Sequence, residues 1–191
     1  MKFNVIYNDP PWSFSSRYVS NNKQTSLTDT YSTLSIDELS RLKISELTKK
    51  DCIMFLWITD CYFEQAIKLF NDWGFKYRTI AFVWIKKYKS GKPVLVMGPW
   101  TMKSTELCLL AIKGNPHKLM TAHNIRQLTI SERQEHSKKP NEVRRRIELM
   151  FKDLPKIELF AREKHIGWTC IGNEIDGKDI KQSINEVINE V

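Results

Sequence analysis

The sequence predicts an α/β fold with a mostly parallel sheet and helices on both of its faces. Short apolar runs rich in branched residues, at 3–7, 51–57 and 156–161, are typical of buried strands. Between them, residues 60–73 and 141–151 place apolar side chains at helical spacing. Strands that alternate with helices along one chain favour a parallel, doubly wound sheet.

Local patterns set the limits of the other elements. Ser35 is expected to cap a helix, and Glu38 completes a capping box with it. Gly74 is the expected end of the helix over 60–73, and Pro140 immediately precedes the helix over 141–151. The remaining predictions, in chain order, are a mobile polar loop over 15–33, strands over 77–86 and 106–113, a loop and strand over 117–133, and a strand over 168–171.

Length and composition indicate one globular domain over residues 1–178, followed by a polar, amphipathic tail over 179–191 that forms a short helix or is partly disordered. The 191 residues are 41% hydrophobic and 27% charged, without repeats or a low-complexity linker. No apolar run approaches the roughly 18 residues needed to span a bilayer. Residues 1–12 lack the pattern of a signal peptide. We therefore expect a cytoplasmic protein without membrane contact.

Charge indicates a polyanionic partner, while the thiols and imidazoles give no sign of a metal. The formal net charge is +8 and the pI about 9.3, which favours nucleic acid as a partner. Solvated helix faces account for many of the lysines and arginines, but +8 in one small domain still favours this interpretation. The four cysteines contain no C-x-x-C pair and the four histidines no metal-binding spacing. Neither a zinc site nor a disulfide framework is expected.

Asp9-Pro10-Pro11-Trp12 directly follows the first predicted strand. Each proline fixes φ and lacks an N–H, so the chain must turn here. We expect the turn to leave carbonyls that no backbone donor of the motif can claim. A carboxylate, free carbonyls and an aromatic plane at the carboxyl end of a strand suit a flat base with an exocyclic amine. Asp-Pro-Pro is also ordinary turn chemistry and Trp12 a plausible core residue, so these four residues alone leave both interpretations open.

Further segments follow this motif in a fixed order. They are Gly98-Pro99-Trp100 with Glu106 to Gly114, then His136 to Pro140, then Glu158 to Arg162 with Gly167-Trp168 and Gly172 to Glu174. With these segments in this order, the chain resembles the Asp-Pro-Pro-Trp (DPPW) family of adenine-N6 methyltransferases, named for the seventy-kilodalton mRNA adenosine methyltransferase subunit. The resemblance runs from about Phe3 to Gly177.

The resemblance implies a Rossmann-like fold that uses S-adenosylmethionine (SAM), in a permuted order that places the catalytic strand before the strand holding the cofactor. Lys139 matches a family lysine that contacts the methionine carboxylate, and Arg162 an arginine near the ribose. The alternative for Lys139 is an ordinary surface lysine. The alternative for Asn173 and Glu174 is a simple Asn-Glu turn. The predicted cofactor-binding residues are Asn8, Asp9, Lys139, Arg162, Asn173 and Glu174.

The predicted catalytic residues are Asp9, Pro10, Pro11 and Trp12. Asp9 and the Pro10 carbonyl are suited to accept the two hydrogens of an adenine N6 amine and to aim its nitrogen at a methyl group. The proton leaves afterwards, so no strong base is required. Trp12 would stack on the base or form a wall beside it.

Three further residues are predicted to lie at the acceptor site. Tyr31 matches a family tyrosine that flanks the base, Glu106 matches a family acid near the acceptor, and Lys86 is expected to contact a phosphate or the acceptor. Their alternatives are a loop aromatic, an acid paired with a nearby lysine, and an ordinary lysine at a strand end.

The function predicted is SAM-dependent methylation of adenine N6 in DNA by a small bacterial or phage-type enzyme, in the bacterial cytoplasm or an infected host. A target adenine in a duplex would have to flip out. RNA is the alternative substrate, but family members that methylate mRNA carry extra RNA-binding domains. A catalytically silent partner subunit is disfavoured because the motifs are intact, and a cytosine enzyme because it usually carries Ser-Pro-Pro-Tyr. The sequence leaves open the recognition site and whether a homodimer or a specificity subunit is needed.

Overall fold

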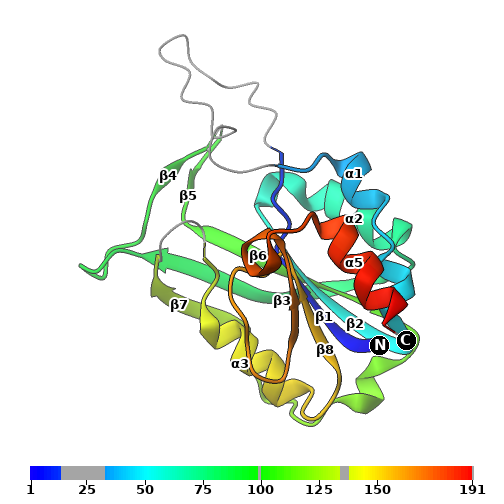
Figure 1. Ribbon diagram of the computed structural model, residues 1–191. Helices are drawn as coiled ribbons and strands as arrows, with labels where there is room; N and C mark the ends of the chain where they lie inside the picture. Colours follow the sequence, from blue (N-terminus) through cyan, green and yellow to red (C-terminus); the bar gives the residue numbers. More distant parts are fainter. Residues whose placement is uncertain (14–32, 99, 134–137, 191) are drawn as a thin grey trace.

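The computed structural model describes residues 1–13, 33–98, 100–133 and 138–190. Tyr31, His136 and nearly all of the loop predicted over 15–33 lie outside the described residues. A seven-stranded sheet runs through the molecule in the order β7-β3-β6-β2-β1-β8-β9 (Figure 1). Its strands are β1 (Phe3–Asn8), β2 (Thr48–Ile58), β3 (Lys76–Lys87), β6 (Thr105–Lys113), β7 (Leu128–Glu132), β8 (Lys156–Leu159) and β9 (Thr169–Ile171). A separate hairpin consists of β4 (Val96–Met97) and β5 (Met102–Lys103).

The sheet is mostly parallel, which confirms the predicted α/β class. Parallel ladders join β1 to β2 and β8, β8 to β9, and β3 to β7. The exception is β6, which pairs antiparallel with both β2 and β3. Its start therefore lies at the edge of the sheet where its neighbours end.

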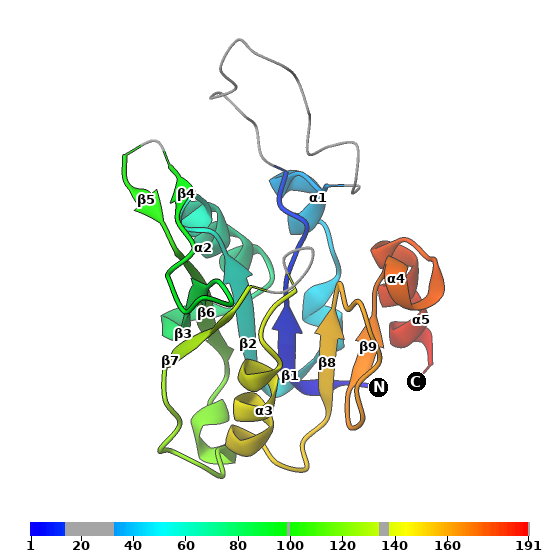
Figure 2. The ribbon, with the colours of Figure 1, turned by 90° about the vertical axis from the view of Figure 1, so that its left-hand side faces the viewer.

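Helices cover both faces of the sheet. They are α1 (Ile36–Ser40), α2 (Phe63–Asp72), α3 (Asn141–Met150), α4 (Asn173–Asp176) and α5 (Ile180–Asn189), with the 3-10 turns η2 (Ile44–Leu47), η3 (Asp60–Tyr62) and η4 (Pro116–Leu119). Helices α1, α2 and α5 pack over one face, where Met54 and Leu56 of β2 are buried. Figure 2 shows α3 in front of the other face, where Phe55 and Trp57 are buried. Because β2 alternates between two covered faces, its apolar run is continuous.

Two local predictions about helix ends are confirmed. The Ser35 hydroxyl accepts a hydrogen bond from the Glu38 N–H, and the Glu38 carboxylate accepts one from the Ser35 N–H. Gly74 has a φ of +77° immediately after the last turn of α2, a conformation that glycine adopts without a Cβ penalty.

The segment after residue 178 contributes to the core. It forms α5, which Asp179 caps, and its apolar stripe of Ile180, Ile184 and Val187 is buried with α1 and α2. The polar side chains noted in the sequence occupy the other side of this helix. Across the described ranges, no helix has the length and apolar character that crossing a membrane requires.

Candidate active site

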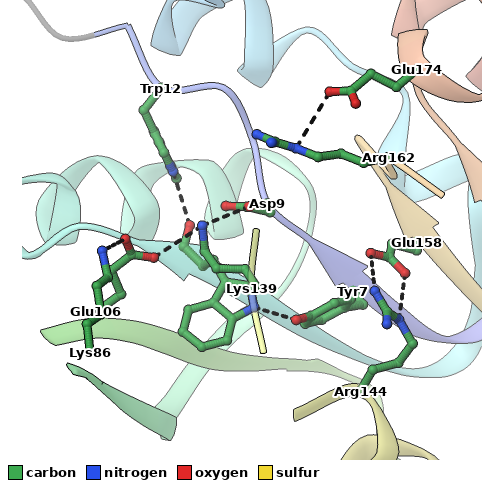
Figure 3. Close-up of polar contacts among 11 residues, drawn as sticks. Tyr7, Asp9, Trp12, Lys86, Glu106, Lys139, Arg144, Glu158, Arg162 and Glu174 are labelled. Atoms are coloured by element: carbon green, nitrogen blue, oxygen red, sulfur yellow. Dashed lines mark hydrogen bonds and ion pairs between the residues drawn. The ribbon is translucent and has the colours of Figure 1, made fainter. Parts of the chain in front are cut away.

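The reversed strand β6 brings polar residues from the two halves of the sheet to one edge. β1, β2, β3 and β8 all end there, whereas β6 begins there. Asp9 directly follows β1, Lys86 is the penultimate residue of β3, and Glu106 is the second residue of β6. An acid from the beginning of one strand thus meets residues from the ends of others (Figure 3).

The backbone of the Asp9–Trp12 turn is more completely bonded than the sequence indicated. The Trp12 N–H donates to the Pro10 carbonyl at 2.9 Å, and the Leu34 N–H donates to the Pro11 carbonyl at 2.9 Å. The prediction that no donor of the motif claims its carbonyls is therefore wrong, because the chain folds back tightly enough for the first N–H after the prolines to reach one of them. A carbonyl oxygen has two lone pairs, so Pro10 keeps the capacity to accept a second hydrogen.

Trp12 is held rigidly in this turn. Its side chain is buried, and its indole N–H donates to the Trp57 carbonyl at 3.1 Å. Tyr62 stacks on the ring with centroids 5.0 Å apart. Because Tyr62 already covers one face of the indole, the geometry favours Trp12 as a fixed wall of the site over a stacking platform.

Lys139 lies between two carboxylates. Its Nζ is 2.8 Å from Asp9 Oδ2 and 3.1 Å from Glu106 Oε2 (Figure 3). The other oxygen of Glu106 accepts a hydrogen bond from Lys86, so the lysine pairing considered as an alternative for this acid is present. The side chains form a row of alternating charge, Lys86–Glu106–Lys139–Asp9, whose charges cancel.

Burial and pairing shift the pKa values of this row in different directions. Burial raises the pKa of Asp9, because the Lys139 ammonium offsets only part of the desolvation. Burial would also raise the pKa of Glu106, but Lys139 and Lys86 outweigh it and the pKa lies below its ordinary value. Burial would lower the pKa of Lys139, but Asp9 and Glu106 raise it instead. Lys139 is therefore a fixed positive charge, and Asp9 is the carboxyl group more easily protonated.

A second pair lies where β8 and β9 end. Arg162 Nε is 3.6 Å from Glu174 Oε1. A Cβ added to Gly172 would lie 2.6 Å from the Ala161 carbonyl oxygen, so only glycine permits this close approach of the two strand ends. The approach places the loop that carries Arg162 beside Glu174.

A cleft joins the ion row to this second pair. Its lining residues are Tyr7, Asp9, Lys138, Lys139, Arg144, Glu158, Phe160, Arg162, Glu163 and His165. Phe160 adopts a left-handed φ of +57°, which costs a non-glycine residue about 1–2 kcal/mol. Such strain gathers at functional sites. Within the described ranges, no group of three or more His, Cys, Asp or Glu residues is arranged to hold a metal ion.

Asn8 is a buried amide beside the cleft residue Asp9. Its side chain is fully buried, and neither its oxygen nor its nitrogen has a hydrogen-bond partner among the described residues. Such a group costs about 1–3 kcal/mol when left unsatisfied. Asn8 therefore has unused capacity for a ligand or a water molecule.

Most residues that line the cleft were not among the predicted site residues, and two of them form a close ion pair. Arg144 of α3 binds Glu158 of β8 through two hydrogen bonds of 2.9 and 3.0 Å, and its guanidinium lies 5.8 Å from the ring centre of Tyr7. The Tyr7 hydroxyl accepts a hydrogen bond from the indole of Trp57 at 2.7 Å. The one signal in the sequence was Glu158 itself, an acid between the apolar residues Ile157 and Leu159.

A comparison with known protein families shows to which family the chain belongs. The family model described as MT-A70 matches residues 3–174, nearly the whole chain. The chain belongs to the MT-A70 family. The family resemblance drawn from the Asp-Pro-Pro-Trp motif and the segments that follow it is thereby confirmed, as is the prediction of a methyltransferase.

Three methyltransferases are similar to this chain over more than 90% of its length. Type II methyltransferase M.MunI of Mycoplasma sp is 36% identical, over 94% of this chain and 81% of M.MunI. N(6)-adenosine-methyltransferase catalytic subunit METTL3 of Homo sapiens is 31% identical, over 92% of this chain and 29% of METTL3. An MT-A70-like N(6)-adenosine-methyltransferase of Arabidopsis thaliana is also 31% identical, over 92% of this chain and 24% of the relative. The chain therefore spans most of M.MunI but less than a third of these two relatives.

The structure brings half of the predicted site residues of this MT-A70 chain into two groups. Asp9, Lys86, Glu106 and Lys139 form the ion row, and Arg162 pairs with Glu174. Asn173 precedes Glu174 and is exposed at the start of α4. Tyr31 lies outside the described residues. The roles of all these residues in binding and catalysis stay predictions.

The Arg144–Glu158 pair predicts a large effect on stability. Both side chains are only 12% exposed, so Arg144→Met leaves a buried carboxylate without its partner. We expect the free energy of unfolding to fall by on the order of 3 kcal/mol, measured by urea denaturation. Arg145→Met, at an exposed neighbouring position, is the matched control and should change stability by less than about 0.5 kcal/mol. Equal effects of the two substitutions would contradict a structural role for the pair.

Proposed function

We propose that this MT-A70 protein transfers a methyl group from SAM to the N6 amine of adenine in DNA. The observation that carries the proposal is the Asp9 carboxylate at the carboxyl end of β1, held through Oδ2 by Lys139. Its other oxygen, Oδ1, has no hydrogen-bond partner within the described residues. The net charge of +8 supports a polyanionic substrate. The greater identity to, and coverage of, Type II methyltransferase M.MunI supports DNA over RNA.

The residues that line the cleft, together with Asn8 and Glu174 beside it, fit SAM. Lys139 and Arg162 supply positive charge suited to a carboxylate and to hydroxyl groups. Glu174 offers acceptors for a ribose diol, and the unpaired amide of Asn8 has both a donor and an acceptor to give. When bound, SAM supplies an activated sulfonium methyl group, which leaves the protein with the task of preparing the acceptor amine.

Asp9 and Pro10 are suited to that task. The adenine amine is a poor nucleophile because its lone pair is delocalised into the ring. With Asp9 Oδ1 and the second lone pair of the Pro10 carbonyl accepting its two hydrogens, the nitrogen is oriented and its lone pair localised. The carboxylate also stabilises the positive charge that develops on the nitrogen. Trp12, fixed by Trp57 and Tyr62, limits the positions open to the base.

Lys139 keeps Asp9 ready for this role. A buried carboxylate without a cation would take up a proton and lose one of its acceptor positions. The ammonium group favours the ionised form, while Glu106 holds the other side of the ammonium. In this arrangement Glu106 and Lys86 act through Lys139 as positioning residues.

The proposal predicts methyl transfer to DNA by the purified chain. The chain is incubated with SAM that carries a tritium-labelled methyl group and with random-sequence DNA or RNA pools of equal length. The methylated nucleosides are then identified by mass spectrometry. We expect N6-methyladenine in the DNA pool, at least about ten-fold above the RNA pool. Preference for RNA would support the alternative substrate, and labelling of neither pool would support a silent partner subunit.

Replacing Asp9 with alanine is expected to abolish turnover while SAM still binds. Lys139 keeps Glu106 as a partner in this variant, so the cleft stays formed. We expect kcat to fall by at least about 100-fold, because the amine loses its charged acceptor, whereas calorimetry should still detect SAM. Asp37→Ala, at an exposed position of α1, is the control. Undiminished turnover by Asp9→Ala would exclude the proposed mechanism.

The pKa shifts predict the direction in which Glu106 moves the pH profile. Asp9 accepts the amine hydrogens only when ionised, so kcat/KM should fall as the pH drops through the raised pKa of Asp9. The negative charge of Glu106 contributes to that elevation. Glu106→Gln should therefore lower the pKa of Asp9 and move the acid limb to lower pH. Glu64→Gln, at an exposed position of α2, should leave the limb in place, and a shift to higher pH in Glu106→Gln would contradict the assignment.

A further inference from the structure

The connection between β3 and β6 carries apolar side chains that no described part of the chain covers. Trp100 and Met97 of the β4–β5 hairpin are 92% and 85% exposed. Four further residues of the same connection are at least half exposed: Tyr88, Leu95, Val96 and Met102. Several large apolar side chains exposed on one short connection indicate an interaction site.

The base of the hairpin is firmly attached to the sheet. Val94 is buried, and its N–H donates to the Lys86 carbonyl at 2.8 Å. On the other leg, Lys103 Nζ is 2.6 Å from Asp60 Oδ1. Figure 2 shows the hairpin standing beyond the edge toward which the arrows of β1, β2 and β8 point. The hairpin therefore projects from the edge of the sheet that holds the candidate active site.

The charged residues of this connection indicate which class of partner binds the exposed apolar side chains. Residues 86–103 contain no Asp or Glu, and their lysines are Lys86, Lys87, Lys89, Lys92 and Lys103. Lys86 and Lys103 are paired with acids, whereas Lys87, Lys89 and Lys92 have no acidic partner among the described residues. Exposed apolar side chains and these three lysines, all on one connection, fit a nucleic acid, whose phosphates surround stacked bases. A second copy of the hairpin would instead bring like charges together.

Building on the proposed function, we propose that the β4–β5 hairpin is a wedge that enters a DNA duplex beside the adenine destined for Asp9. Turning an adenine out of a duplex breaks its pairing and its stacking. Apolar side chains inserted between base steps help to open the stack, and an aromatic ring can stack on the bases left behind. Trp100 and Met97 supply these groups, while Lys87, Lys89 and Lys92 are available to the flanking phosphates.

If the hairpin is a wedge, its apolar side chains should contribute to methylation of double-stranded DNA and contribute little to methylation of single-stranded DNA. Trp100→Ala is assayed on one random-sequence DNA pool, either annealed to its complement or single-stranded. We expect kcat/KM to fall about ten-fold on the annealed pool, which corresponds to the loss of one base–aromatic contact, and less than about two-fold on the single-stranded pool. Leu149→Ala, which removes an exposed apolar side chain of α3, should affect neither pool. Equal losses on both pools would overturn the wedge.

A binding measurement tests the same contact without turnover. The annealed pool should quench part of the tryptophan fluorescence of the wild-type chain. Trp100→Phe should abolish this part of the quenching yet keep most of the activity on the annealed pool, because an aromatic ring remains. If the wild-type chain methylates neither pool, the proposed function fails, and the quenching alone then decides whether the hairpin contacts duplex DNA. Absence of quenching at Trp100, or a dimer in sedimentation that Trp100→Ala dissociates, would overturn the wedge and assign the hairpin to a protein interface.

Discussion

The Lys139 ammonium between Asp9 and Glu106 is the contact on which the candidate site depends. It joins the end of β1, the start of β6 and the approach to α3 at one point. Without this cation, Glu106 would keep only Lys86 as a partner, and the pKa of the buried Asp9 carboxyl would rise further because nothing comparable would offset its desolvation. The ring of Trp57 lies 5.7 Å from the ammonium and helps to exclude water from it. One lysine thus fixes both the geometry and the charge of the residue proposed to orient the amine.

The direction of β6 makes this contact geometrically feasible. In a sheet of parallel strands only, each strand offers the active edge the residues at its carboxyl end. The reversal of β6 offers residues from its beginning, so Glu106 stands beside Lys86 although the two are 20 residues apart in the chain. On the other side of β1, the close approach at Gly172 brings Arg162 and Glu174 together. The Lys86–Glu106 pair and the Arg162–Glu174 pair therefore flank Asp9 from opposite directions.

Much of this architecture could be predicted because its signals are local. The apolar run at 3–7, the Ser35–Glu38 capping box and the stop at Gly74 each depend on neighbouring residues, and each is confirmed. The direction of β6 could not be predicted, because a central strand covered on both faces has the same continuous apolar pattern in either direction. The partner of the Pro10 carbonyl depends on how tightly the prolyl turn closes. Likewise, the Arg144–Glu158 pair joins a helix to a strand, and neither residue specifies the other in the sequence.

The hairpin lies outside the paired part of the strands that hold the candidate site. The β3–β6 ladder extends to the pairing of Ile85 with Thr105, and the hairpin begins only beyond that point. The exposed residues from Leu95 to Met102 lie outside the paired part of the ladder, so exchanging them leaves the register of the ladder, and with it the position of Glu106, unchanged. In a chain built in this way, the proposed wedge can change while the ion row stays constant. The connection between β3 and β6 is thus a place where engineers could exchange the proposed wedge without rebuilding the candidate site.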